Sequence, residues 1–530
     1  MDFIEIKNLS FCYPNQDKKV LKDINLTIKK GEFITLFGAS GCGKTTLLKH
    51  IKKELIPQGE RQGEVFVSGK PILETNFSLV GFVGQNPDAG LVCDKVWSCL
   101  SFGLENMGLK RDEMSRRIAE TSTFFGIHRM MQTKVHKLSG GQKQLLNLAS
   151  QIVMQPEILV LDEPTAQLDP ISAETFLHTL SRINKETGTT IILSEHRLED
   201  AIPLSDRVLA IENGKILSFD TPKIVSKILT EKEHDLCLSL PSSARVFFAC
   251  EHDKTKDIPL TVNEGRRWIS DKNAHEISCV EKELNNEIAL KGKGIYFRYE
   301  KESVDILRDL NIEISKGEIF AILGGNGTGK STLLSILGGV KKAYDGKLIR
   351  NGKTALLPQN PINLFSENTV LEDLEKITKN KQNLEKIINF CEISDILKRH
   401  PFDLSGGQLQ RSALAMVLLT NTDILLLDEP TKGMDAKFKE KLCAGLKELA
   451  KEQMTIVMVS HDVEFCAKVS DRCCMFFDNT LSAPTQPQEF FGNNAYYTTA
   501  SSRIARGKTP NIATTLDLIS ALGGNKNENK

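Results

Sequence analysis

Two short apolar runs, far apart along the chain, begin the same local pattern. Phe33–Phe37 and Ile319–Leu323 each lead into a glycine-rich stretch, and helical patterns beginning at Thr46 and Thr332 follow. A short apolar run bounded by glycines indicates a buried strand, and apolar residues at helical spacing indicate a helix. The pattern therefore predicts a strand–loop–helix unit that occurs twice.

Unbroken aliphatic runs mark a second pair of strands. Ile158–Leu161 and Ile424–Leu427 are each followed by two acidic residues, and further predicted strands follow at Thr190–Ser194 and Thr455–Ser460. Aliphatic residues without alternation fit a strand that is covered on both faces. We therefore predict an α/β fold whose ligands bind at the carboxyl ends of its strands.

Three motifs occur twice in the same order, and this internal repeat sets the architecture. They are Gly38–Thr45 with Gly324–Ser331, Leu138–Gln142 with Leu404–Gln408, and Leu161–Thr165 with Leu427–Thr431. The first pair lies 286 residues apart, whereas the second and third pairs lie 266 apart. The second copy is therefore 20 residues shorter, and the loss precedes the Leu-Ser-Gly-Gly-Gln motif.

The repeat predicts two tandem domains in the chain of 530 residues, which is too long for one hydrophobic core. We expect domains at 1–230 and 288–485, a linker at 231–287 and a tail at 486–530. Within the linker, Thr261–Glu264 has the pattern of a capping box and predicts a short helix through Trp268. The tail is predicted to dock as a helix that ends before Gly523. Its apolar positions are Leu516, Ile519 and Leu522.

Composition narrows the classes of function. Basic and acidic residues balance at 68 each, so net charge does not favour a nucleic-acid partner. The 12 cysteines lack the paired Cys-x-x-Cys spacing of zinc sites, which predicts reduced and mostly buried thiols. No apolar run approaches the roughly 18 residues of a membrane span, and the first residues lack a secretion signal. We therefore expect a peripheral protein on the cytoplasmic side.

The first repeated motif has the composition of a phosphate-binding loop. Its glycines let backbone N–H groups surround phosphate oxygens, and the next helix adds positive potential at its N-terminus. Lys44 and Lys330 are predicted to reach the β- and γ-phosphates of ATP, and Thr45 and Ser331 to bind Mg²⁺. The residues predicted to contact nucleotide in the two loops are Gly38, Ala39, Ser40, Gly41, Cys42, Gly43, Lys44, Thr45, Thr46, Gly324, Gly325, Asn326, Gly327, Thr328, Gly329, Lys330, Ser331 and Thr332.

The acid pairs that end the aliphatic strands complete a predicted hydrolytic site. Asp162 and Asp428 are placed to hold Mg²⁺ through water. Glu163 and Glu429 are placed to orient or deprotonate the attacking water. The combination predicts an ATP-hydrolysing enzyme that uses Mg²⁺.

The pentapeptide Leu-Ser-Gly-Gly-Gln ahead of an acidic strand is the mark of the ATP-binding cassette (ABC) family, which both repeats resemble. The resemblance implies that each cassette has a RecA-like phosphate-loop core, an antiparallel β subdomain and a helical subdomain. It also implies that this signature motif opens a helix facing the γ-phosphate bound by the other cassette. Ser139 and Gly141 would then act on ATP at the second phosphate loop, and Ser405 and Gly407 on ATP at the first.

The resemblance assigns four further roles to matched pairs of residues. Gln85 and Gln359 would sense and ligate magnesium and position water, and His196 and His461 would contact the γ-phosphate. Tyr13 and Tyr299 would stack on adenine. Asp169 and Asp435 would cross the seam of the cassette dimer. Both copies keep the lysine, acid pair, glutamine and histidine, so we predict two competent sites. The two cassettes are expected to close on ATP within one chain and to reopen after hydrolysis.

Three classes of process compete for the work that this motor drives. A DNA-repair or ribosome-recycling ATPase usually carries cysteine clusters, which this chain lacks. A tandem-cassette translation factor on the ribosome is the main alternative, although its cassettes are joined by a long, strongly charged helical arm. Here the linker contains Pro241 and Pro259 and mixed charges.

More specific likenesses favour the ATPases of energy-coupling factor (ECF) importers. The segments that resemble these ATPases are Gly84–Asp88 and Ser101–Leu109 and, for the second cassette, Leu357–Pro361 with Leu364 and Phe365. The segments that resemble fused double-ATPase members of the group are Ser194–Asp200, Pro259–Trp268 and Tyr496–Ala500. The resemblance implies uptake of a vitamin, a vitamin precursor or a metal ion, with thiamine precursors and cobalt as the usual substrates. It also implies a transmembrane scaffold subunit and a substrate-binding membrane subunit as partners. Because the shortening lies ahead of the signature motif, the two cassettes are expected to offer unlike grooves to the scaffold.

Overall fold

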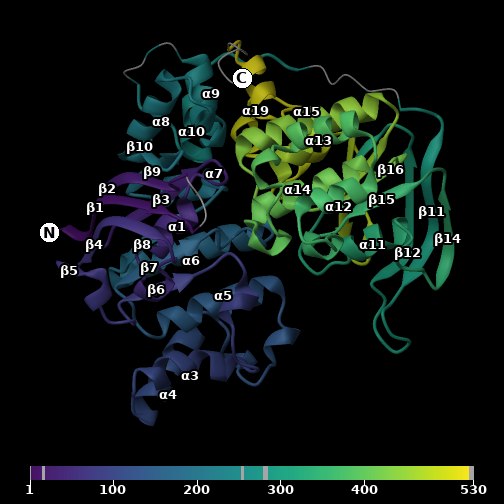
Figure 1. Ribbon diagram of the computed structural model, residues 1–530. Coiled ribbons are helices and arrows are strands. Elements are labelled where there is room, and N and C mark those ends of the chain that lie inside the picture. The colour runs from purple at the N-terminus through teal and green to yellow at the C-terminus, as the bar shows by residue number, and fades with distance from the viewer. Residues whose placement is uncertain (1, 15–17, 252, 254–255, 278–283, 525–530) are drawn as a thin grey trace. The chain divides into compact units, whose positions relative to one another are not determined.

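The computed structural model describes residues 2–14, 18–251, 253, 256–277 and 284–524 (Figure 1). The chain divides into two compact units, unit 1 from Met1 to Ala244 and unit 2 from Arg245 to Lys530. Each unit contains a six-stranded, mostly parallel sheet and a smaller antiparallel sheet. The predicted α/β fold class is therefore confirmed in both halves.

The central sheet of unit 1 has the strand order β10-β9-β3-β8-β7-β6. Its strands are β3 (Phe33–Gly38), β6 (Val80–Val83), β7 (Ile158–Asp162), β8 (Thr190–Ser194), β9 (Arg207–Glu212) and β10 (Lys215–Asp220). All are parallel to their neighbours except β10, which is antiparallel to β9. Every residue of β7 and β8 is buried, which accounts for the aliphatic runs without alternation.

The smaller sheet of unit 1 has the order β2-β1-β4-β5. Its strands are β1 (Asp2–Cys12), β2 (Leu21–Lys29), β4 (Glu60–Val67) and β5 (Lys70–Pro71). Ile4 of this sheet, Leu36 of the central sheet and Leu47 of the helix after the phosphate loop belong to one buried cluster. The strand before the phosphate loop and the helix after it are therefore both anchored in one packed core.

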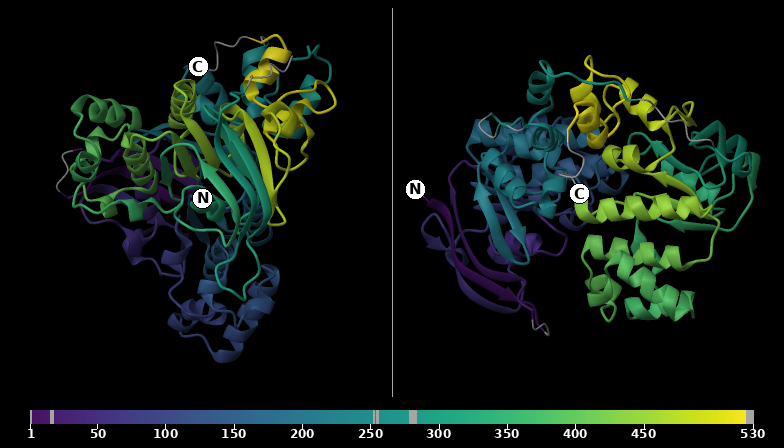
Figure 2. Two further views of the ribbon diagram at one scale, coloured as in Figure 1. Left: turned by 90° about the vertical axis from the view of Figure 1, so that its right-hand side faces the viewer. Right: turned by 90° about the horizontal axis from the view of Figure 1, so that it is seen from above.

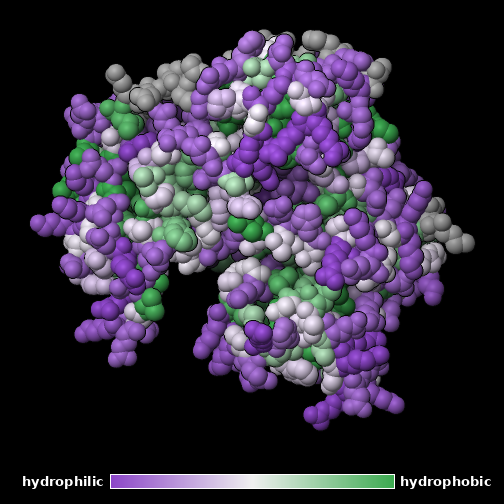
Figure 3. All heavy atoms as spheres, turned by 180° about the vertical axis from the view of Figure 1, so that it is seen from behind, coloured by the Kyte–Doolittle hydropathy of each residue, from purple (hydrophilic) through white to green (hydrophobic). Residues whose placement is uncertain are grey.

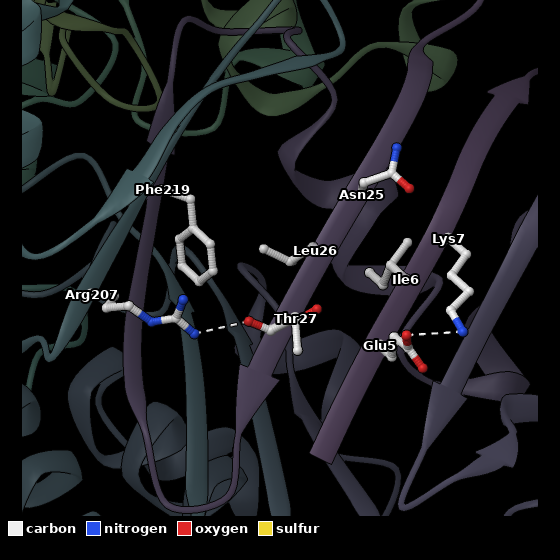
Figure 4. Close-up of a pocket in the computed structure, with 8 residues that line it drawn as sticks. All are labelled: Glu5, Ile6, Lys7, Asn25, Leu26, Thr27, Arg207 and Phe219. Atoms are coloured by element: carbon white, nitrogen blue, oxygen red, sulfur yellow. Dashed lines mark hydrogen bonds and ion pairs between the residues drawn. The ribbon is translucent and has the colours of Figure 1, made fainter. Parts of the chain in front are cut away.

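Arg207, at the start of β9, ties the two sheets of unit 1 together. It donates to the backbone oxygen of Thr27 at 2.9 Å and to Glu32 at 2.7 Å, and its guanidinium carbon lies 3.9 Å from the centroid of the Phe219 ring. Figure 4 shows Arg207 and Phe219 facing strands β1 and β2 across an open pocket. None of the predicted site residues lines this pocket.

The helices of unit 1 cover the sheet and extend beyond it. They are α1 (Lys44–Lys49), α2 (Pro87–Gly90), α3 (Val96–Asn106), α4 (Arg111–Phe124), α5 (Gly140–Ile152), α6 (Pro170–Thr187), α7 (Leu198–Ala201) and α8 (Pro222–Glu231), with α9 (Ser242–Cys250) crossing into unit 2. Apolar residues of α3 to α6 form a second buried cluster with the other face of the central sheet. The signature helix α5 is thereby fixed to the strands that carry the acids.

Unit 2 repeats the two sheets, with orders β15-β16-β17-β13-β18-β19 and β12-β11-β14. The strands are β11 (Ile288–Phe297), β12 (Leu307–Ser315), β13 (Ile319–Leu323), β14 (Asp345–Arg350), β15 (Thr354–Leu357), β16 (Ile424–Asp428), β17 (Thr455–Val459), β18 (Arg472–Phe477) and β19 (Thr480–Leu481). The helices are α10 (Val262–Ile269), α11 (Lys330–Leu337), α12 (Val370–Ile377), α13 (Lys381–Cys391), α14 (Gly406–Leu419), α15 (Ala436–Lys451), α16 (Val463–Val469), α17 (Pro487–Asn493), α18 (Ala500–Ala505) and α19 (Thr515–Ala521).

The predicted linker and tail pack on each other inside unit 2. The capping box is confirmed, because the Thr261 hydroxyl accepts the Glu264 N–H at 3.1 Å and the Glu264 carboxylate accepts the Thr261 N–H at 3.2 Å. The docked tail helix is confirmed as α19, although Leu516 is 41% exposed. Helices α9, α10, α18 and α19 share one buried cluster, and both views of Figure 2 show the yellow C-terminal helices beside teal ones. Parts of the predicted linker and tail, at 252, 254–255, 278–283 and 525–530, lie outside the described residues.

The shortening of the second copy falls mainly in its β-rich part. Between the phosphate-loop lysine and the glutamine predicted to ligate magnesium, unit 2 is 12 residues shorter, and between that glutamine and the signature serine it is 8 residues shorter. Unit 1 has the additional strand β5 in the first interval, whereas the described chain of unit 2 passes from β14 to β15 after three residues. The shortening is therefore divided between the stretch before this glutamine and the stretch between the glutamine and the signature motif.

Candidate active sites

Each phosphate loop folds around its own lysine. The loop of unit 1 joins β3 to α1, and that of unit 2 joins β13 to α11. Lys44 is buried, and its Nζ donates to the backbone oxygens of Gly38 at 3.0 Å and Ala39 at 3.2 Å. The lysine of unit 2 makes the same contacts with the first two residues of its loop, at 2.9 and 2.6 Å. Both loops thus enclose an ammonium group, as phosphate binding requires.

A glycine with positive φ makes the turn from each loop into its helix. φ is 105° at Gly43 and 118° at Gly329. A Cβ on Gly43 would lie 3.0 Å from the backbone oxygen of Val20, and one on Gly329 would lie 2.7 Å from a methyl carbon of Ile306. Glycine is therefore required for both conformation and space.

The two predicted adenine-stacking tyrosines are joined to their phosphate-loop helices. The Tyr13 hydroxyl lies 3.0 Å from Thr46 Oγ1, and the Tyr299 hydroxyl lies 3.0 Å from Thr332 Oγ1. The Tyr299 side chain is 59% exposed, so its ring is open to a ligand. These contacts place each tyrosine beside its loop, and stacking on adenine stays a prediction.

The acids of unit 1 lie together at the carboxyl end of β7. Burial and the neighbouring Glu163 raise the pKa of Asp162, while contacts with Thr45 and Lys44 oppose the rise. Burial disfavours the charged form of Glu163 too, but the nearby His196 and Lys44 outweigh it and lower the pKa of Glu163 to about 2. The pair thus contains one acid that stays ionised at neutral pH and a neighbour whose ionisation is opposed.

Glu163 holds two other predicted site residues by its side chain. Its Oε2 accepts a hydrogen bond from Gln85 Nε2 at 2.8 Å, and its Oε1 lies 2.9 Å from His196 Nε2. Gln85 follows β6, and His196 follows β8, the strands on either side of β7. The structure therefore brings together residues from three neighbouring strands, which sequence order alone does not place side by side.

Unit 2 has the same acids with different contacts. Glu429 Oε1 lies 3.3 Å from His461 Nε2, but Glu429 Oε2 accepts the backbone N–H of His461 at 3.1 Å. Burial raises the pKa of Asp428, and contacts with Ser331 and Lys330 oppose that rise. The two sites therefore have the same residues but not the same hydrogen bonds.

The signature motifs form capping boxes at the N-termini of α5 and α14. Ser139 Oγ accepts the Gln142 N–H at 3.3 Å, and Gln142 Oε1 accepts the Ser139 N–H at 2.9 Å. Ser405 and Gln408 make the same pair of bonds, at 3.4 and 3.0 Å. The serine and glutamine therefore have a structural role within their own helix, which the sequence analysis did not predict. Their predicted action on ATP stays a prediction.

The acids predicted to cross the dimer seam cap the helices after the acid pairs. Asp169 Oδ1 accepts the Ser172 N–H at 3.0 Å at the start of α6. Asp435 Oδ1 accepts the Phe438 N–H at 2.9 Å at the start of α15. Each therefore begins a helix, and a contact across a seam stays a prediction.

The donor set at each acid pair fits Mg²⁺. The Oδ1 atoms of Asp162 and Asp428 are buried and have no hydrogen-bond partner in the described part of the chain. A buried carboxylate oxygen without a donor is costly, and a hydrated cation would satisfy it. Hydroxyl and carboxylate oxygens are also ligands that Mg²⁺ prefers. Within the described residues, no group of three or more histidine, cysteine or acidic side chains offers an alternative metal site.

Two residues near the sites were assigned no role there from the sequence. Glu195, next to His196, is 2% exposed, and Lys432 lies near both acids of unit 2, where burial lowers the pKa of its ammonium group. Aligning the repeats places Glu195 opposite Ser460 and Lys432 opposite Ala166, and this mismatch is the signal that the sequence offers. Both mark differences between the two sites.

Comparisons with known proteins agree with this geometry. Residues 21–166 and 307–432 match the family model described as ABC transporter. A "Putative ABC transporter ATP-binding protein" of Bacillus cereus is 43% identical over 98% of this chain and 97% of its own length. The "Putative HMP/thiamine import ATP-binding protein YkoD" of Bacillus subtilis is 28% identical over 92% of each chain.

Among solved structures, an archaeal ribosome recycling factor, aABCE1 in complex with the ribosomal stalk protein aP1, superposes with a TM-score of 0.61. It is 23% identical and covers 92% of this chain and 91% of its own, which shows a shared fold only. The chain belongs to the ABC transporter family and carries two of its ATPase cassettes. Membership implies nucleotide binding and ATP hydrolysis.

Proposed function

We propose that each unit binds Mg²⁺–ATP at its phosphate loop and hydrolyses it with the glutamate that follows the aspartate. The observation that carries this proposal is the contact of Glu163 with both Gln85 and His196. Glu163, ionised at neutral pH, would orient or deprotonate water, His196 would contact the γ-phosphate, and Lys44 would neutralise phosphate charge. Mg²⁺, held by Thr45, Asp162 and Gln85 in unit 1 and by Ser331, Asp428 and Gln359 in unit 2, would supply further charge neutralisation when bound.

We further propose that the signature motif of each cassette completes the ATP site of the other. The fusion of two cassettes supports this, because it makes their meeting intramolecular. Closure on ATP and reopening after hydrolysis would then be the mechanical output.

Substitution of the two glutamates tests the hydrolytic roles. Glu163→Gln and Glu429→Gln should each lower the turnover rate of the site that contains the glutamate by at least about 100-fold. The double variant should be inactive. Glu174→Gln, an exposed glutamate of α6, is the matched control and should leave turnover unchanged. Two competent sites are contradicted if Glu163→Gln alone abolishes all turnover and Glu429→Gln changes nothing.

We also propose that the chain is the energy-coupling subunit of an ECF-type importer for a vitamin, vitamin precursor or metal ion. The relative named for HMP/thiamine import supports this across nearly the whole chain. Phe102 of α3, within the segment Ser101–Leu109 that resembles ECF ATPases, is 48% exposed, and Trp97 on the same helix is 39% exposed. Figure 3 shows hydrophobic residues gathered among hydrophilic ones on the lobe of unit 1 that carries α3. No helix in the described residues could cross a bilayer, so this role needs membrane partners.

Recovery of the tagged chain from membranes tests the importer proposal. We expect it to co-purify with a transmembrane scaffold and a substrate-binding membrane subunit, and Phe102→Glu should weaken this capture. Phe477→Glu, at a phenylalanine of unit 2 that is 73% exposed and lies outside the proposed surface, is the control. Recovery of the Glu163→Gln, Glu429→Gln double variant on ribosomes, without membrane proteins, would favour the translation factor instead.

A further inference from the structure

Glu195 is a buried acid beside the site of unit 1 that unit 2 does not have. It stands between the end of β8 and His196, and it is 2% exposed. The corresponding residue of unit 2 is Ser460, between β17 and His461. A buried carboxylate persists only where hydrogen bonds satisfy its oxygens, so its partners indicate its role.

Both oxygens of Glu195 accept hydrogen bonds from segments that form the site. Oε1 accepts from the backbone N–H of Thr165 at 3.1 Å and from its hydroxyl at 2.6 Å. Oε2 accepts from the backbone N–H groups of His196 at 3.1 Å and Arg197 at 3.4 Å. Arg197 adds a second tie to the same segment by donating to the Leu168 backbone oxygen at 2.9 Å. Glu195 thus joins the segment after the acid pair to the segment that carries the histidine.

In unit 2 the backbone N–H groups of the histidine and of the residue after it have other partners. The N–H of His461 donates to Glu429 itself, and the Ser460 hydroxyl lies 3.5 Å from the same Glu429 oxygen. The Ser460 hydroxyl also accepts the Asp462 N–H at 3.1 Å. Because position 460 is a serine, Glu429 itself accepts the N–H of the histidine. In unit 1 a separate residue, Glu195, accepts the equivalent N–H.

We propose that Glu195 is a positioning residue for hydrolysis in the first cassette. By accepting the His196 N–H, it leaves both oxygens of Glu163 for the side chains of Gln85 and His196. This inference rests on the proposed function, in which Glu163 acts on the attacking water. A glutamate already held by its site partners needs less rearrangement before reaction, so the first site hydrolyses ATP faster than the second. ATP affinity is unaffected, because the hydrogen bonds of the Glu195 carboxylate do not reach the phosphate loop.

Single-site kinetics of the full chain test the proposal. In a Glu429→Gln background, Glu195→Ser should lower kcat on the order of tenfold and leave the KM for ATP within about twofold. Glu195→Gln, which keeps one acceptor oxygen, should have a kcat between those of the Glu195 protein and the Glu195→Ser variant in this background. Hydrogen exchange without nucleotide gives a second readout. Peptides covering 163–169 and 195–198 should exchange faster in Glu195→Ser, and a peptide covering the phosphate loop at 38–45 should not change.

Two controls separate this inference from the proposed function. If Glu163→Gln abolishes turnover in the same background but Glu195→Ser leaves kcat unchanged, the positioning role is wrong and the function stands. If Glu163→Gln leaves turnover intact, the proposed function fails and this inference fails with it. An equal rise in exchange at the phosphate loop would also overturn the proposal, because it indicates general loosening. Should Glu195→Ser not fold, Ser460→Glu in a Glu163→Gln background should raise kcat at the second site, and no increase would overturn the proposal.

Discussion

The glutamates that follow β7 and β16 adopt a backbone conformation that is uncommon outside glycine. φ is 47° at Glu163 and 52° at Glu429. Their N–H groups donate to the backbone oxygens of Ser194 and Val459, each at 2.9 Å, and these bonds help to hold the conformation. Local strain at equivalent positions of two repeats is typical of sites where side-chain direction matters for chemistry.

Ionisation of Glu163 gives a prediction at this scale. Its folded pKa of about 2 lies below the ordinary value of 4.5, so its contribution to stability is present above pH 4.5 and is lost as pH falls toward 2. Glu163→Gln should therefore flatten the pH dependence of the free energy of unfolding in this window, by roughly 1 to 3 kcal/mol. Urea unfolding of unit 1 at several pH values measures it. Glu174→Gln should keep the wild-type slope, and a wild-type slope in Glu163→Gln would contradict the assignment.

Much of each site could be predicted at the scale of single residues, because phosphate binding and hydrolysis need particular groups in a particular order. The contacts among those groups were harder to predict from the sequence. The signature motif that contains Ser139 and Gln142 was predicted to act on ATP, but hydroxyl and amide groups can also cap a helix, and the structure shows that these two do. Glu195 was missed because one acidic residue after a strand has many possible partners, and only the fold brings Thr165 beside it.

At the scale of elements, α10 shows how local and distant interactions combine. Its capping box was predictable because both partners lie within four residues. Its packing was not, since Arg266 donates to the backbone oxygen of Arg503 at 2.7 Å, across more than 200 residues. Glu251 of the preceding segment accepts from Trp268 at 3.3 Å and from Lys272 at 3.1 Å, which holds the two sides of the predicted linker together.

Removal of the cap at α10 should weaken unit 2 alone. Thr261→Ala leaves the Glu264 N–H without its acceptor and should cost about 1 kcal/mol, seen as a lower Tm for unit 2. Thr123→Ala in α4 is the control, because the Thr123 hydroxyl only bonds a carbonyl one turn earlier, and its effect should stay within about 0.5 kcal/mol. Equal effects of the two changes would show that the capping box contributes nothing specific.

At the scale of the whole molecule, the tail is part of the core of the second cassette. Phe490 and Phe491 of α17 belong to the same buried cluster as Phe465 and Cys466 of α16. Helix α16 follows the histidine of the second site, His461. The partly buried Glu464 of α16 accepts the backbone N–H of Ala500 at 2.9 Å at the start of α18. The tail was predicted as a separate segment because its polar composition hides these few deeply buried residues.

Deletion of residues 486–530 should therefore affect the two units unequally. Loss of two buried phenylalanines alone removes several kcal/mol from unit 2, so its thermal transition should fall steeply or the unit should aggregate. The transition of unit 1 should persist, since its described core clusters contain no tail residue. Differential scanning calorimetry separates the two transitions. Tyr496→Ala, at an 81% exposed side chain, should leave both in place, and a stable truncated unit 2 would contradict this account.

The pairing of α10 with α18 and α19 has a consequence for how the protein is made. The N-terminal unit can fold while the ribosome is still translating the rest, because its contacts close within its own span. The first helix of the second unit must wait for about 250 further residues before α19 emerges, roughly 10 to 50 s at ordinary rates of elongation. During that interval Ile269 and its apolar neighbours lack their final cover. The newborn chain thus passes through a stage at which unit 1 can be folded while the apolar face of α10 in unit 2 is still without α18 and α19.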